Sequence, residues 1–84
     1  MTLLEDHASI HSREDFVVFV RALRKDLHDN PASWENPNLE RFLEALGAWV
    51  EDTYNLYLKQ GKPIPQHLDW KAVGDMLMAA KMYE

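Results

Sequence analysis

Hydrophobic residues recur at helical spacing in three segments of the chain. The first stripe consists of Phe16, Phe19, Val20, Leu23 and Leu27. This i, i+3, i+4, i+7 spacing places the side chains on one face of a helix. Ser12 is a suitable N-cap, and Pro31 disfavours helix at the residue before it. The pattern therefore predicts a helix at about 13–28.

A longer stripe follows in the second segment. It consists of Leu39, Phe42, Leu43, Leu46, Trp49, Val50, Thr53 and Tyr57. Asn36 followed by Pro37 suggests an N-cap and a first helical residue, with Asn38 as the rival cap. Gly61 is a natural residue for the C-terminal cap. We expect a helix at about 37–60.

The third segment begins after an extended connector, Lys62-Pro63-Ile64-Pro65. Its inward stripe consists of Trp70, Val73, Leu77 and Ala80. Asp69 precedes this stripe and is a good N-cap. These features predict a helix at about 70–83.

The three stripes together indicate an all-α fold. The sequence contains no segment that combines strand alternation with β-branched enrichment. Connections of about eight or nine residues between amphipathic helices favour a compact three-helix bundle. We expect one helical domain at 12–84, preceded by an irregular N-terminal arm at 1–11.

Composition narrows the classes of function. The chain has 84 residues, the size of one domain, and no cysteine, which excludes disulfides and thiolate metal sites and favours a cytoplasmic protein. No apolar run reaches the roughly 18 residues of a membrane span, so we expect no membrane partner. The net charge of -5 argues against nucleic-acid binding and favours a basic protein partner.

The strongest candidate surface is an acidic ridge formed by Glu40, Glu44 and Glu51. At 100° per residue these three side chains lie within about 40° of one another, opposite the apolar stripe of their helix. The ridge is either a solvated helix face or a docking surface for a basic partner. We adopt the docking surface as the leading hypothesis.

A second hypothesis places a ligand or enzymatic pocket at the loop before this helix. Its residues would be Trp34, Glu35, Asn36 and Trp49. A buried Glu35 would have a perturbed pKa, which is typical of functional sites. The alternative is that Glu35 and Asn36 satisfy backbone groups of the loop and the helix ends.

Other side chains suggest little chemistry. We expect no catalytic residue, since the chain lacks a cysteine nucleophile and a Gly-rich phosphate loop. His7 and His11 are four residues apart, but Ala8 stands where a metalloprotease motif needs its general base, and we expect no metal and no cofactor. A third hypothesis is a self-associating structural module that uses Val17, Val18, Met78 and Met82.

The loop and second helix carry a pattern that resembles a small bacterial domain family of unknown function. The pattern reads Asp29-Asn30-Pro31, Trp34-Glu35-Asn36, Leu39, Phe42-Leu43-Glu44-Ala45-Leu46, Trp49 and Asp52. The resemblance spans from about Ile10 to the end of the chain and implies no activity or catalytic residues. Small bacterial domains of this kind are often immunity proteins, antitoxins or phage-encoded inhibitors. The resemblance therefore suggests a non-enzymatic inhibitor that docks on a basic partner.

Overall fold

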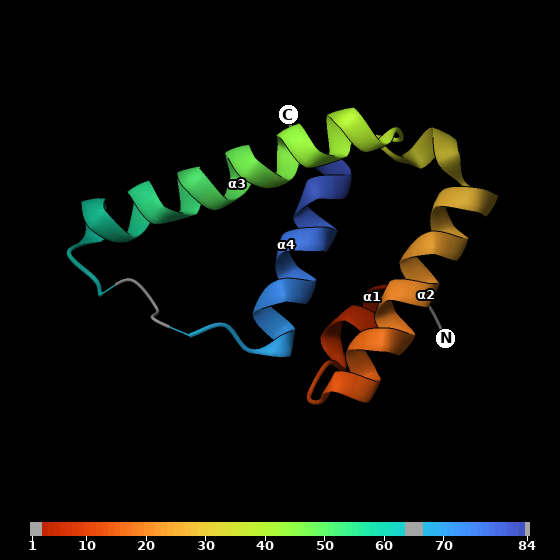
Figure 1. Cartoon of the computed structure of the whole chain (residues 1–84), viewed down its shortest axis with the longest axis horizontal. Coiled ribbons are helices and arrows are strands. Elements are labelled where there is room, and N and C mark those ends of the chain that lie inside the picture. Colours follow the sequence, from red (N-terminus) through yellow and green to blue (C-terminus); the bar gives the residue numbers. More distant parts are fainter. Residues whose placement is uncertain (1–2, 64–66, 84) are drawn as a thin grey trace.

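The computed structural model describes residues 3–63 and 67–83 and shows an all-helical chain over these residues (Figure 1). Its elements are α1 (Leu3–Ala8), α2 (Arg13–Asp29), the 3₁₀ turn η1 (Pro31–Ser33), α3 (Leu39–Gln60) and α4 (Trp70–Met82). The all-α prediction is confirmed, and the three long helices are the three expected. Ile64 and Pro65 of the predicted connector, and the chain ends at 1–2 and 84, lie outside the described residues.

Polar side chains fix where α2 and α4 begin, as the sequence predicts. The Ser12 hydroxyl accepts a hydrogen bond from the Asp15 backbone N–H at 3.1 Å. The Asp69 carboxylate accepts one from the Ala72 N–H at 2.7 Å. Each bond satisfies an N–H group that has no partner inside its helix.

The start of α3 differs from the leading prediction. The helix begins at Leu39, and Asn38 caps it by accepting a hydrogen bond from the Arg41 N–H at 2.9 Å. The expectation of a start at Pro37 with Asn36 as cap is wrong, because the Asn36 side chain is committed to α4. At the other end Gly61 has φ 68, the left-handed conformation that favours glycine after a helix.

The N-terminal arm was expected to be irregular, but Leu3–Ala8 form the short helix α1. Six residues are too few to show a clear periodicity, and a helix this short is stable only when it is packed. α1 packs against α2 and α4. His7 anchors it, with its Nε2 atom 2.7 Å from Oδ1 of Asp75 on α4.

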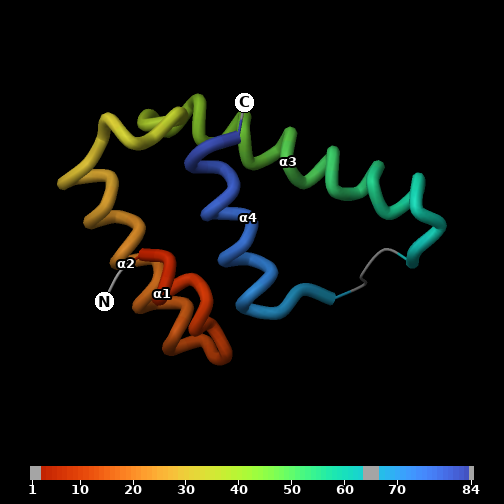
Figure 2. The backbone as a smooth tube through the Cα atoms, turned by 180° about the vertical axis from the view of Figure 1, so that it is seen from behind, coloured from red at the N-terminus to blue at the C-terminus, as the bar shows by residue number. Residues whose placement is uncertain are grey.

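α4 is the central helix of the fold. It packs against α1, α2 and α3. α2 and α4 run side by side, α1 lies across one face of this pair, and α3 crosses their ends (Figures 1 and 2). The C-terminal half of α3 extends away from the other helices, which gives the molecule extents of 41 × 28 × 16 Å.

The core lies where α1, α2 and α4 meet. Phe19 and Ile10 are almost completely buried, and Leu23 and Trp34 extend the same cluster. Gly74 permits this close packing, because a Cβ atom at that position would lie 2.5 Å from Cδ1 of Ile10.

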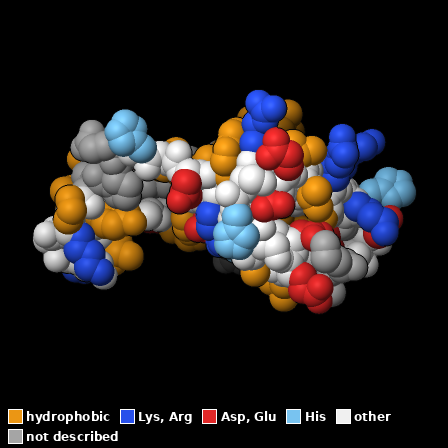
Figure 3. Space-filling view, turned by 90° about the horizontal axis from the view of Figure 1, so that it is seen from below, with side chains coloured by type: hydrophobic (Ala, Val, Ile, Leu, Met, Phe, Trp, Pro, Cys, Tyr) orange, Lys and Arg blue, Asp and Glu red, His pale blue; other side chains and the backbone are white. Residues whose placement is uncertain are grey.

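The projecting half of α3 keeps much of its apolar surface exposed. Its exposed large hydrophobic side chains are Val50, Tyr54, Leu56 and Leu58. Viewed from below, hydrophobic side chains are visible on this end of the molecule, separate from the body of mixed charge (Figure 3). A small core thus leaves one long helix with an incompletely covered face.

Candidate functional site

The acidic ridge lies on the surface of α3. Glu40, Glu44 and Glu51 are all exposed, and the helix that carries them is continuous from Leu39 to Gln60. None of the three forms an ion pair with a residue that the structure describes. The ridge therefore presents three carboxylates to solvent.

A hollow of about 420 Å³ adjoins the ridge. It is lined by Glu35, Asn36, Arg41, Glu44, Ala45, Ala48 and Tyr83. Glu44 belongs to both the ridge and the hollow. Arg41 approaches Glu35, but its Nη2 atom lies 3.9 Å from Oε1 and both side chains are about half exposed, so this ion pair contributes little.

The four residues predicted to form a pocket are not gathered around one cavity. Glu35 and Asn36 line the 420 Å³ hollow, whereas Trp34 and Trp49 are outside its lining. The Glu35 side chain is 44% exposed, so it lacks the burial that would have made it a candidate acid or base.

Asn36 has an architectural role. Its buried side-chain amide donates hydrogen bonds to the carbonyl oxygens of Ala80 at 3.0 Å and Tyr83 at 2.6 Å. Its backbone N–H donates to the carbonyl of Lys81 at 3.1 Å. These bonds join the loop to the C-terminal end of α4, where helix carbonyls lack partners within the helix. The expectation that Asn36 satisfies helix-end groups is confirmed.

Trp34 lies in the same loop, and its side chain is buried in the core cluster. Its indole Nε1–H donates to Asp26 Oδ2 at 2.8 Å. Lys81 Nζ donates to the same oxygen at 2.8 Å and lies 5.5 Å from the centre of the Trp34 ring. The hydrogen bond from Lys81 holds the pKa of Asp26 below its usual value; burial opposes this shift, and the bond from Trp34 adds to it.

Sequence reasoning missed this cluster because its members are far apart in the chain. Asp26 and Lys81 are separated by 55 positions, and neither belongs to a recognisable motif. The one signal that could have found it is the position of Trp34 in a short loop, because so large an apolar side chain tends to pack on the core.

Tyr83 borders the hollow at the end of α4. Its hydroxyl donates a hydrogen bond to Asp52 Oδ2 on α3. The Asp52 carboxylate raises the pKa of Tyr83, chiefly because it accepts that proton in a hydrogen bond. Asp52 is thus engaged within the chain, unlike the three glutamates of the ridge.

The residues of the self-association hypothesis lie on two helices. Val17 and Val18 are exposed on α2, and Met82 is exposed near the end of α4. Met78 is partly buried and packs against the core, so it is engaged within the chain.

His7 and His11 are also separated. His7 contacts Asp75, whereas His11 lies beyond the end of α1 and donates its backbone N–H to Asp15 at 3.0 Å. Within residues 3–63 and 67–83, no group of three or more potential ligands of the His, Cys, Asp and Glu types is placed to hold a metal ion. None of the helices in these ranges is both long and apolar enough to cross a membrane.

Comparison with known proteins identifies a family. A family model described as a family of unknown function, DUF7660, matches residues 12–84. This agrees with the resemblance to a small domain family of unknown function. No curated protein and no solved structure matches the chain.

Proposed function

The chain belongs to this family of unknown function, and we propose that it is a non-enzymatic protein-binding domain that docks on a basic partner through the acidic side of α3. The observation that supports this most is the continuity between the ridge and the hollow. Glu44 takes part in both, so Glu35, Glu40, Glu44 and Glu51 border one acidic surface.

The ridge is suited to attract a partner because its charges are free to interact. Unpaired carboxylates on a helix surface keep their field, whereas an internal ion pair would reduce it. The net charge of -5 adds a long-range attraction toward basic proteins. Such complementarity raises the association rate and specificity more than the affinity itself.

The hollow is suited to receive one long basic side chain. Glu35 and Glu44 line it together with Arg41, and a guanidinium accepted between the two carboxylates would replace the weak contact of Arg41 with Glu35 by charge-assisted hydrogen bonds. The Asn36 amide donates to α4 and so does not compete for the same cation. An Arg or Lys of the partner would then be the anchor of the interface, as arginines often are.

The class of partner follows from the charge and the size of the domain. A small acidic domain that covers a basic site by charge complementarity would serve as an immunity-like, antitoxin-like or phage-encoded inhibitor of a basic enzyme such as a nuclease. A chain without cysteine is suited to the reducing cytoplasm, where we place this function.

The proposal is tested by capture from a native lysate with three baits. The first is the wild type, and the second is Glu40→Gln/Glu44→Gln/Glu51→Gln. The third is the control Glu5→Gln/Glu14→Gln/Asp29→Asn. It changes the net charge by the same amount as the ridge variant, but its substitutions lie on α1 and α2. We expect a basic protein to be retained by the wild type and the control and lost from the ridge variant. Equal retention by all three baits would overturn the proposal.

A further inference from the structure

α3 carries a second surface beside the acidic ridge. Apolar and small polar residues recur along it at alternating spacings of four and three, and we call this set the seam. The seam consists of Leu39, Leu43, Leu46, Val50, Thr53 and Tyr57. A 4-3 repeat of this kind is the signature of a helix that packs lengthwise against another helix.

The chain's own helices cover the seam only in part, and Leu46, Thr53 and Tyr57 are half-buried. Leu39 is 72%, Leu43 54% and Val50 39% exposed. α4 packs against another side of α3, where Ala45 is buried. At 100° per residue, Ala45 lies about 120° from the middle of the seam.

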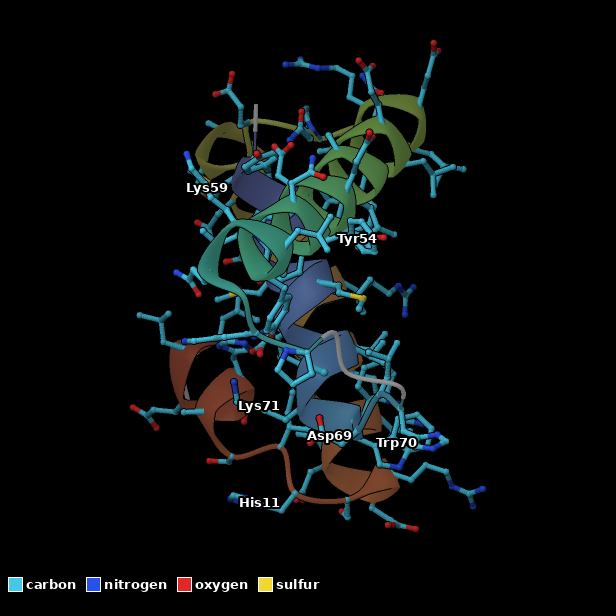
Figure 4. The ribbon with its side chains drawn as sticks, turned by 90° about the vertical axis from the view of Figure 1, so that its left-hand side faces the viewer. His11, Tyr54, Lys59, Asp69, Trp70 and Lys71 are labelled. Atoms are coloured by element: carbon cyan, nitrogen blue, oxygen red, sulfur yellow. The ribbon has the colours of Figure 1, made fainter. Side chains whose placement is uncertain are left out.

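Other exposed apolar side chains lie on the same side of the molecule. Tyr54, which adjoins the seam, and Trp70 of α4 both project from the side of the ribbon opposite α1 (Figure 4). On α2 and α3 an apolar groove of about 340 Å³ adjoins the seam at Leu39. Its apolar lining includes Val20, Leu23, Leu27, Trp34, Phe42 and Leu77.

Gly47 supplies an independent observation. It lies in the middle of α3 and is exposed, and no heavy atom among the described residues comes within 4 Å of a Cβ placed there, apart from its chain neighbours and the local backbone. Glycine weakens a helix interior relative to alanine, and no contact among the described residues requires it here. At an interface, a glycine allows two helix backbones to approach closely. At 100° per residue Gly47 lies about 80° from the middle of the seam, at the flank of the contact.

We infer that the seam pairs with the seam of a second copy of this chain, in antiparallel orientation. The seam is self-complementary about its centre at position 48. Leu39 then lies opposite Tyr57 of the second copy, and Leu46 lies opposite Val50 of the second copy. The seam holds no charge, so no like charges meet in its layers.

The shape of the chain favours the antiparallel arrangement. The helical body lies beside the N-terminal half of α3, and the C-terminal half projects free (Figure 1). Antiparallel pairing places the free half of each copy beside the body of the other. Tyr57 of the second copy then lies next to Leu39, at the edge of the apolar groove.

The contact is large enough for a stable dimer. A helix of 22 residues is about 33 Å long, and pairing along it with the groove included buries on the order of 600–800 Å² per copy, near the size of a standard interface. Glu44 and Glu51 point away from the seam and stay exposed in the pair. The dimer therefore does not depend on the proposed basic partner.

Sedimentation equilibrium of three chains tests the inference. We expect the wild type to have twice the mass of one chain, and Val50→Glu to weaken dimerisation at least tenfold. The control is Asn55→Glu, which places the same charged side chain at an exposed position of the same helix about 160° from the seam, and which should leave the dimer intact. A wild type that stays monomeric up to about 1 mM would overturn the inference, as would equal effects of the two substitutions.

Gly47→Gln separates dimerisation from folding. The new side chain has open space within the chain and is a better helix former, so the melting temperature of the monomer should rise. The same side chain would hold the two helices apart, and dimerisation should weaken. A stabilised variant that dimerises as well as the wild type would contradict the close approach at Gly47.

Cross-linking tests the orientation, because the chain has no cysteine of its own. Leu39→Cys and Tyr57→Cys chains of different mass are mixed and oxidised. The antiparallel pair predicts a disulfide between the two kinds of chain. Disulfides only between chains of the same kind would indicate a parallel pair and overturn the proposed arrangement.

Discussion

At the scale of single residues, side-chain hydrogen bonds hold the loop between α2 and α3 against its neighbouring helices. Asn36 joins the loop to the last carbonyls of α4, and Trp34 joins it to Asp26 of α2. Lys81 of α4 donates a hydrogen bond to the same Asp26 carboxylate. These contacts explain why Trp34 and Asn36 are buried without forming a catalytic pocket.

Replacement of Asn36 by alanine should destabilise the fold by about 1–3 kcal/mol, because it leaves the buried carbonyl of Ala80 and the partly buried carbonyl of Tyr83 without this donor. Chemical denaturation with urea measures this difference. Asn55→Ala on the exposed side of α3 is the control and should change stability by less than about 0.5 kcal/mol. Equal effects of the two substitutions would show that the Asn36 bonds are unimportant.

The Asp26 carboxylate should make stability depend on pH. Its pKa is lowered in the folded chain, mainly by the hydrogen bond from Lys81. A lowered pKa contributes stability above the unfolded value of about 4, and this contribution is lost as the pH falls through the folded pKa. Asp26→Asn should therefore cost about 1–2 kcal/mol at neutral pH and less as the pH approaches about 2. Urea denaturation across this range tests it, and a cost that does not change with pH would contradict the assignment.

At the scale of elements, much of the fold is predictable because the helices and their ends depend on residues that are close together in the sequence. The apolar stripes, the caps at Ser12 and Asp69, and the glycine at the end of α3 identify the three long helices. The start of α3 is harder to predict, since Asn36 and Asn38 are both good caps and only the contact of Asn36 with α4 decides between them.

Features that depend on tertiary contacts escape prediction from sequence. α1 is helical through its packing against α2 and α4, and its sequence alone shows no clear stripe. The ridge was predictable from helical spacing, because it lies on one element. The hollow was not, because Tyr83 and Glu35 are brought together only by the fold.

Two glycines in different helices should respond in opposite ways to alanine. Gly74→Ala forces a methyl group toward the buried Ile10 side chain and should destabilise the fold by about 1–3 kcal/mol. Gly47→Ala meets open space and should stabilise the single chain by about 0.5–1 kcal/mol. Thermal denaturation of both in the Val50→Glu background, which keeps the chain monomeric, gives the comparison. Stabilisation by Gly74→Ala would contradict the tight contact between α4 and Ile10.

At the scale of the whole molecule, acidic and apolar surfaces lie on different sides of one helix, α3. A small core joins α1, α2 and α4, and α3 carries the free surfaces. The acidic ridge and hollow lie on one side of α3, and the apolar seam and groove lie on another. Glu44 and Glu51 lie about 120–140° from the middle of the seam, so one helix can serve self-association and partner binding at the same time.

The central claim is that the carboxylates on α3 recognise a basic partner, and the affinity of the captured partner tests it most directly. The dissociation constant is measured for the wild type and for Glu40→Gln/Glu44→Gln/Glu51→Gln at low and physiological salt. We predict that the variant binds at least about tenfold more weakly at low salt. Its dissociation constant should also change less with salt, because the lost interactions are charge–charge attractions that salt screens. An unchanged dissociation constant with unchanged salt dependence would contradict the account.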